Sequence, residues 1–148
     1  MIRRPMRRAV RAVPAIPAEH TEQVALFRWA KLAAGAHPEL RLMFAVPNGG
    51  HRHKATAGRL KAEGVKSGVP DIILPVARGG FHGLYLELKR QKGTRPTAEQ
   101  RQWLADLEAE GYRTDWCRGW EPAREVIVAY LALPRVLSGS ISEPAVSP

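Results

Sequence analysis

The chain has 148 residues, 45% of them hydrophobic, and a formal net charge of +9 at pH 7. This length suits one domain with its own hydrophobic core, and no segment holds the ~18 consecutive apolar residues of a membrane span. A strongly basic chain favours nucleic acid as its partner, because neutralised phosphates release counterions; a basic chain without a polyanion partner is the alternative. The single cysteine, Cys117, excludes an internal disulfide and indicates a reducing, intracellular compartment. We expect Cys117 to be buried and inert.

The first 19 residues predict a disordered basic arm. They hold five arginines against one acid, a net charge of +4 (5 − 1), and three prolines that oppose a stable helix. Such an arm either grips phosphates or only keeps the chain soluble, and the sequence leaves both interpretations open.

The next stretch predicts a helix that Thr21 caps and that ends near Ala34, before Gly35. Glu22 lies four residues before Leu26 of the apolar stripe, so it belongs to the core-facing side of the first turn. The helix dipole favours a carboxylate at this position. The alternative is that Glu22 is aimed at a functional site on the sheet.

Strands and a helical insert are expected in the middle of the chain. A strand over 40–46 leads into a glycine turn, and a helix over 53–63 follows. Strands over 71–76 and 84–89 then form a hairpin around the glycine-rich residues 77–83.

The hairpin holds charges where a buried pair of strands is expected. In its second strand, period-2 alternation puts three leucines on one face and Glu87 and Lys89 on the other. With the turn centred near Gly79, Asp71 lies across from Glu87. A register slipped by one residue places Asp71 opposite Leu88 instead.

The C-terminal half predicts a helix, a strand and a last helix. Thr97 and Gln100 fit a capping box for a helix that ends near Gly111. A strand over 112–117 precedes the last helix, which carries Pro122 in its first turn and ends near position 133.

The chain therefore divides into a disordered basic arm (1–19), one domain (20–133) and a disordered tail (134–148) rich in Ser, Pro and Gly. The order of elements predicts the α/β class, with helices packed on a small mixed sheet. Four tryptophans lie in patterned elements, which favours the core or a dimer interface over base stacking: Trp29, Trp103, Trp116 and Trp120.

Asp71 and Glu87 on one face of the hairpin would repel each other unless a cation lies between them. A divalent ion supplies that charge, and oxygen ligands suit Mg²⁺ or Mn²⁺. Lys89 points the same way as Glu87, where an ammonium can orient water or stabilise charge on a phosphate. A cross-strand ion pair would explain the same charges without chemistry, and an isolated Glu-x-Lys is weak evidence because alternation alone produces it.

Short motifs follow one another along residues 20–133: His20-Thr21-Glu22-Gln23, Pro47-Asn48-Gly49-Gly50, Gly68-Val69-Pro70-Asp71, Glu87-Leu88-Lys89, Thr97-x-x-Gln100 and Gly119-Trp120. The third and fourth match the PD-(D/E)xK nuclease signature. Together, the motifs resemble the VRR-NUC (virus-type replication-repair nuclease) domain in the standalone form found in bacteriophages and bacteria.

The resemblance implies a restriction-endonuclease-like core and metal-dependent phosphodiester hydrolysis. By this resemblance, Asp71 and Glu87 bind Mg²⁺ or Mn²⁺, and the carbonyl of Leu88 is a third protein ligand. Glu22 is implied as an outer or second-metal acid.

The same resemblance implies that Lys89 is the catalytic lysine and that Gln100 places this lysine or the attacking water. Phosphate contacts are expected from Asn48 and from basic residues that flank the site in sequence: Lys54, Arg59, Lys61, Lys66, Arg90, Lys92 and Arg95. An ordinary turn at Asn48 and a solvated surface of replaceable cations are the alternatives.

The predicted function is a metal-dependent DNA endonuclease, structure-selective for branched DNA such as four-way junctions. The resemblance further implies a homodimer in the cytoplasm of a bacterial cell or phage-infected host, with no membrane and no small-molecule cofactor. The alternatives are a nucleic-acid-binding module without catalysis and a sequence-specific restriction-type nuclease.

Overall fold

The computed structural model describes residues 18–47 and 54–135. In chain order, the elements of these residues are α1 (Ala18–Ala33), η1 (Pro38–Leu42, a 3-10 helix), β1 (Phe44–Ala45), α2 (Lys54–Ala62), β2 (Ile72–Leu74), β3 (Leu84–Lys89), α3 (Ala98–Ala109), β4 (Arg113–Arg118) and α4 (Trp120–Leu131). No helix among them is long and apolar enough to cross a membrane.

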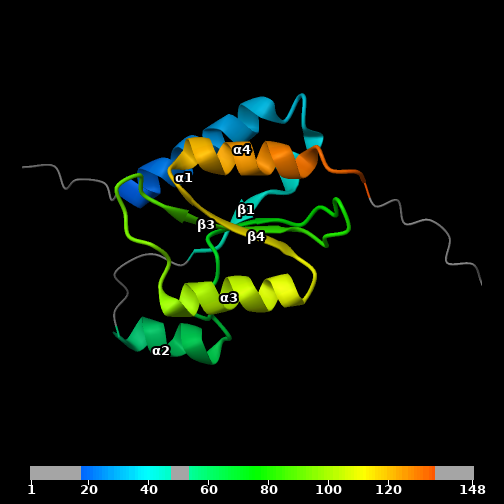
Figure 1. Cartoon of the computed structure of the whole chain (residues 1–148). Coiled ribbons are helices and arrows are strands. Elements are labelled where there is room, and N and C mark those ends of the chain that lie inside the picture. The colour runs from blue at the N-terminus through cyan, green and yellow to red at the C-terminus, as the bar shows by residue number, and fades with distance from the viewer. Residues whose placement is uncertain (1–17, 48–53, 136–148) are drawn as a thin grey trace, which may run out of the picture.

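The four strands form one mixed sheet in the order β1-β2-β3-β4. The pairs β1–β2 and β2–β3 are antiparallel, whereas β4 returns parallel to β3 after the crossover through α3. Helices α1 and α4 cover one face of the sheet and α3 covers the other (Figure 1). The predicted α/β class, a small mixed sheet flanked by helices, is confirmed.

The leucine face of β3 forms the centre of the core. Leu84, Leu86 and Leu88 are at most 3% exposed, and they pack in one cluster with Leu26 of α1 and Ile127 of α4. Alternation along the strand then turns the other side chains toward the α3 face. The fold therefore places the charged residues of β3 between the sheet and α3.

Two predicted boundaries differ from the structure. Helix α1 begins at Ala18 instead of being capped by Thr21, so the last two residues of the predicted arm are helical. The predicted strand over 40–46 is wrong in its first half, where η1 precedes the short β1. Pro38 suits the first turn of η1, and Leu40 and Met43 are both buried three residues apart, which is a helical rather than a strand period.

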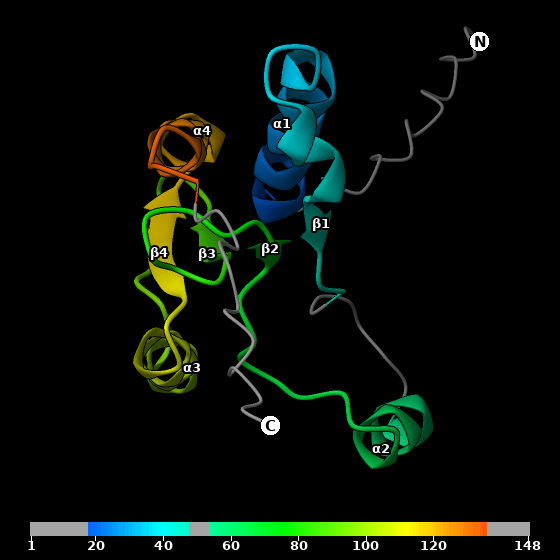
Figure 2. The same ribbon diagram turned by 90° about the vertical axis from the view of Figure 1, so that its right-hand side faces the viewer.

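Helix α2 is set off from the sheet (Figure 2). The segment that connects it to β2 returns past α3, where the Ser67 hydroxyl donates to Glu99 Oε1 at 2.6 Å. The indole N–H of Trp103 donates to the Ser67 carbonyl at 3.0 Å. These two bonds fix the connecting segment against α3.

The start of the predicted tail is ordered at Pro134 and Arg135, contrary to the expectation of disorder from 134. The Gly79 N–H donates to the Pro134 carbonyl at 2.8 Å, and Arg135 forms a bridge with Arg78 of the β2–β3 connection. The rest of the predicted tail and of the predicted arm lies outside the described residues.

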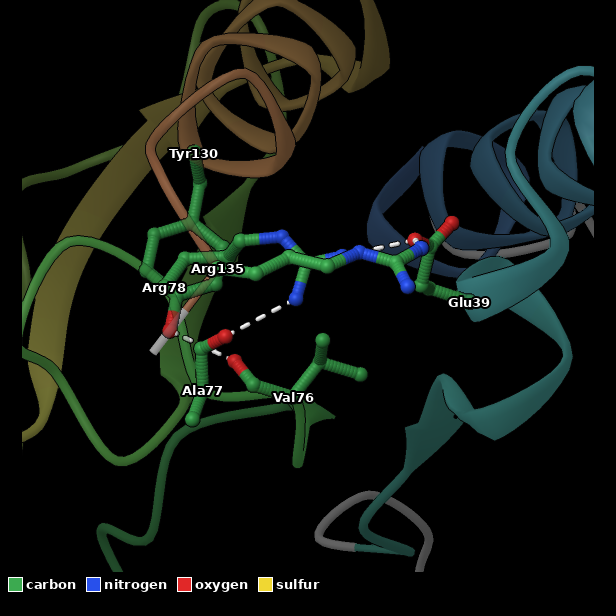
Figure 3. Close-up of polar contacts among 6 residues, drawn as sticks. All are labelled: Glu39, Val76, Ala77, Arg78, Tyr130 and Arg135. Carbon is green, nitrogen blue, oxygen red and sulfur yellow. Dashed lines mark hydrogen bonds and ion pairs between the residues drawn. The ribbon is translucent and has the colours of Figure 1, made fainter. Parts of the chain in front are cut away.

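Polar contacts among the side chains of Arg78, Arg135 and Glu39 join three segments (Figure 3). The Arg78 side chain, in a residue only 5% exposed, donates to Glu39 Oε1 at 2.6 Å and to the Ala77 carbonyl at 2.8 Å. Arg135 donates to the same carboxylate oxygen at 2.6 Å. Nearby, the Tyr130 hydroxyl of α4 donates to the Val76 carbonyl at 2.7 Å. These bonds hold η1, the β2–β3 connection and the end of α4 together.

Candidate active site

The register of the hairpin brings Asp71 beside Glu87. Ile72 pairs with Leu86 and Ile73 with Tyr85, so Asp71, one residue before β2, comes opposite Glu87. The Leu88 N–H donates to Asp71 Oδ2 at 2.9 Å. The predicted register, rather than the one slipped by one residue, is confirmed.

Glu87 is a fully buried carboxylate with one satisfied oxygen. Its Oε1 accepts from Lys89 Nζ at 2.8 Å and from Gln100 Nε2 of α3. Its Oε2 is buried without a hydrogen-bond partner among the described residues. An unsatisfied buried carboxylate oxygen costs free energy in the folded state, so it marks a position where a ligand would bind favourably.

The pKa values of both acids are raised, which also indicates a position where a cation would bind favourably. The pKa of Glu87 is raised to about 7, because burial and the neighbouring charge of Asp71 together outweigh the hydrogen bond from Lys89, which lowers it. Burial also raises the pKa of Asp71, against the Leu88 N–H and the charge of Lys89, which lower it. One lysine therefore does not compensate the negative charge that burial concentrates on this pair.

Gln100 links the start of α3 to the buried acid. Its N–H donates to Thr97 Oγ1 at 3.2 Å, and its Oε1 accepts from the Thr97 N–H at 2.9 Å, which confirms the predicted capping box. The Nε2 of the same amide donates to Glu87. The cap therefore fixes the side chain that contacts the carboxylate.

Glu22 and Glu19 of α1 lie in different surroundings. Glu22 Oε2 accepts from the Trp120 N–H at 2.9 Å, so this carboxylate caps the N-terminus of α4. The charge of Glu19, in contrast, raises the pKa of both Asp71 and Glu87. Its position three residues before Glu22 is the signal that could have identified it, since i and i+3 share a helix face. The assumed helix start at Thr21 concealed it.

The described residues offer only a few oxygen ligands for a divalent ion near Glu87. Within residues 18–47 and 54–135, no three His, Cys, Asp or Glu side chains are arranged to hold a metal. The set that remains is the carboxylates of Asp71 and Glu87 beside the backbone of Leu88. Mg²⁺ is commonly bound through one or two carboxylates together with water and substrate phosphates. Glu87 Oε2, which has no partner within the described ranges, and the neighbouring carboxylate of Asp71 fit such a site.

The residues predicted to contact phosphates lie on α2 and on the connections that lead to β2 and to α3. Arg59 and Lys61 lie on α2, where Arg59 pairs with Glu63 at 3.4 Å. Lys54 begins α2, and Asn48 lies outside the described residues. The others are exposed in the connections that lead to β2 or to α3: Lys66, Arg90, Lys92 and Arg95. Of these cations, Lys61 and Lys66 line one cleft beside α3.

Cys117 is buried, and burial raises the pKa of its thiol to about 12, as expected for an inert cysteine. Trp29 and Trp120 are partly buried against the core. Trp103 instead lines a cleft beside α3.

A mixed sheet flanked by helices, with an Asp and a Glu-x-Lys brought together on adjacent strands, defines the class of restriction-endonuclease-like nucleases. Within that class, the chain belongs to the VRR-NUC domain family, whose model matches residues 12–121. A solved structure of a VRR_NUC domain protein is 26% identical, with a TM-score of 0.67 over 82% of this chain and 93% of that one. No curated protein matches the chain.

Proposed function

We propose that this nuclease is a metal-dependent DNA endonuclease that is selective for branched DNA. The observation that carries the proposal is the buried Oε2 of Glu87, which has no hydrogen-bond partner in the described parts of the chain and belongs to a carboxylate next to a second one, Asp71. The two acids are held together at the cost of a raised pKa on both. A bound divalent cation would relieve that cost.

Asp71 and Glu87 would hold Mg²⁺ or Mn²⁺, with the carbonyl of Leu88 as a third protein ligand. When bound, the ion supplies polarisation of the scissile phosphate and lowers the pKa of a water molecule. Glu22 of α1, whose carboxylate caps the start of α4, remains a proposed outer acid. Glu19 is better placed to add negative charge to the site, because its charge raises the pKa of Glu87.

Lys89 would stabilise the transition state. Its ammonium is held 2.8 Å from Glu87 in a side chain only 11% exposed, so it needs little reorganisation to meet charge that develops on a phosphate. Gln100 would keep Glu87 in place, because the Oε1 of the same side-chain amide is anchored in the α3 cap. It would thereby position Lys89 as well.

The exposed cations and the net charge of +9 support DNA as the polyanion. Selectivity for branched DNA such as four-way junctions, action as a homodimer, and a cytoplasmic setting in a bacterium or phage-infected host are carried over from the family resemblance.

The test is a cleavage assay with labelled linear, nicked, flap and four-way DNA, each with Mg²⁺, Mn²⁺ or EDTA. We expect metal-dependent cutting that favours a branched substrate. Glu87→Gln keeps the shape of the side chain and should reduce the rate by about 10²–10³. Glu125→Gln, an equal change of charge at a side chain 74% exposed on α4, is the matched control.

Metal-dependent cutting that survives Glu87→Gln would refute the assigned site. DNA binding without cutting on any substrate would favour a binding module, and equal cutting of plain duplex at one sequence would favour a restriction-type nuclease.

A further inference from the structure

A cleft of about 760 Å³ opens beside the proposed active site, between α3 and the segment that runs from α2 to β2. Apolar side chains such as Leu60, Val65 and Trp103 line it together with the charged side chains of Lys61 and Lys66. Gln100 lines the cleft too, and the same side chain donates to Glu87. The cleft therefore adjoins the carboxylates through a single residue.

One wall of the cleft is built by tight packing. Gly68 has φ +75°, and a Cβ there would lie 2.7 Å from the Glu99 side chain and 3.1 Å from Trp103. Ser67 bonds to both of these α3 residues. The segment can approach α3 this closely only with glycine at position 68. The indole of Trp103 is thereby held in a fixed orientation along the wall.

The chemistry of the cleft combines an aromatic ring with cations. Lys66 Nζ lies 5.9 Å from the centre of the Trp103 ring, within the range of a cation–π contact. Proteins bind unpaired nucleotides with this combination, because bases stack on aromatic rings while lysines contact the phosphates. Stacked bases in a duplex cannot offer a free ring face to such a wall.

We propose that this cleft binds an unstacked nucleotide of the DNA strand that is cut, and that it selects DNA with unpaired nucleotides near the scissile phosphate. The inference rests on the proposed DNA cleavage and adds a source for its selectivity. A second copy of the chain would also cover apolar side chains, but it would not account for two lysines in a cleft that Gln100 links to Glu87. A nucleotide accounts for both features, because its base would contact the apolar side chains and its phosphate the lysines.

The first experiment measures binding in EDTA and does not depend on cleavage. The probe is a fluorescein-labelled thymidine tetranucleotide, read by anisotropy against the full chain. Val65→Glu places a negative charge at a side chain already 43% exposed in the cleft and should weaken binding roughly tenfold. Leu32→Glu makes the same change of net charge at an 86% exposed position on α1 and should change affinity less than twofold.

Two further readouts locate the nucleotide. In NMR spectra of the wild type, the tetranucleotide should shift the indole N–H signal of Trp103 and leave that of Trp29 in place. In cleavage assays, the ratio of rates for a duplex with a one-nucleotide bulge over the same duplex fully paired should exceed one. In Val65→Glu this ratio should fall toward one.

Equal tetranucleotide affinity in Val65→Glu and Leu32→Glu would overturn the proposal, as would an unshifted Trp103 signal. A change from dimer to monomer in Val65→Glu with unchanged tetranucleotide affinity would show a protein interface instead. If the wild type binds the tetranucleotide at Trp103 but cuts no DNA, the nuclease proposal fails while the nucleotide site stands.

Discussion

Among the described residues, Glu39 and Glu87 each meet basic side chains in a buried or half-buried setting, and the two acids differ in how completely they are satisfied. At Glu39, two arginines donate to one carboxylate oxygen, and the cluster ties three segments together (Figure 3). At Glu87, Lys89 and Gln100 share one oxygen while the other has no partner among the described residues. Burial of charge is common to both, so burial alone does not identify the functional site.

The pKa values of the two acids move in opposite directions. A hydrogen bond from its own backbone lowers the pKa of Glu39, and the two arginines lower it further against the effect of burial. Burial and the charge of Asp71 raise the pKa of Glu87 to about 7. An acid that the fold stabilises in its charged form serves structure, whereas an acid that the fold leaves under-compensated is available for a ligand.

The largest effect on stability is expected at the satisfied cluster. Arg78→Met removes one of the two arginines that donate to Glu39 and also the donor to the Ala77 carbonyl, and it should lower the free energy of unfolding by about 2–4 kcal/mol, measured by urea denaturation. Arg113→Met is the control, because Arg113 is half exposed and lies 3.9 Å from Asp115, where a surface pair contributes about 0–1 kcal/mol. Equal losses in the two variants would show that the Arg78 pair is no more important than a surface pair.

At the unsatisfied site, the main effect should appear in catalysis. Lys89→Ala should reduce the cleavage rate by about 10²–10³ while DNA affinity changes less than about threefold, because the ammonium acts mainly on the transition state. Lys92→Ala, at an exposed position three residues along the chain, should do the reverse and weaken binding in a salt-dependent way. If Lys89→Ala weakens binding as much as cutting, Lys89 only anchors the DNA.

The hairpin shows how much of this site the sequence could predict. Period-2 alternation and a glycine turn predicted the observed register beside one slipped by a residue, and Gly79 and Gly80 do have positive φ values. The capping box at Thr97 could also be predicted, because both of its partners lie within one helical turn. Local patterns therefore predicted the α/β fold and the pairing of Asp71 with Glu87.

Contacts between distant segments were not predictable in this way. Arg78 lies in a glycine-rich connection without periodicity, and its partner Glu39 is 39 residues away. Glu19 was missed because its importance depends on where α1 begins, and the cleft at Trp103 depends on how the segment before β2 packs on α3. Each of these features is set by tertiary packing, which no local pattern encodes.

The smallest predicted effect is the pH dependence of stability in EDTA. Between pH 4.5 and about 7, unfolded Glu87 has lost its proton while the folded protein keeps it, so the unfolded state binds fewer protons and stability falls as pH rises. At about 1.4 kcal/mol for each pKa unit, the loss can reach about 3 kcal/mol. Urea denaturation from pH 5 to 8 measures it, and this window lies above the titration of Glu39, whose pKa is lowered.

Glu87→Gln separates this loss from that of other titrating groups. The variant should remain nearly as stable at pH 8 as at pH 5, because its amide does not ionise, and only the smaller contribution of Asp71 should persist. Adding Mn²⁺ at pH 8 to a hundred times its dissociation constant should restore about 2.7 kcal/mol to the wild type and little to the variant. A wild type that grows more stable as pH rises, or equal stabilisation of both proteins by the ion, would contradict the assignment of Glu87 as the under-compensated acid.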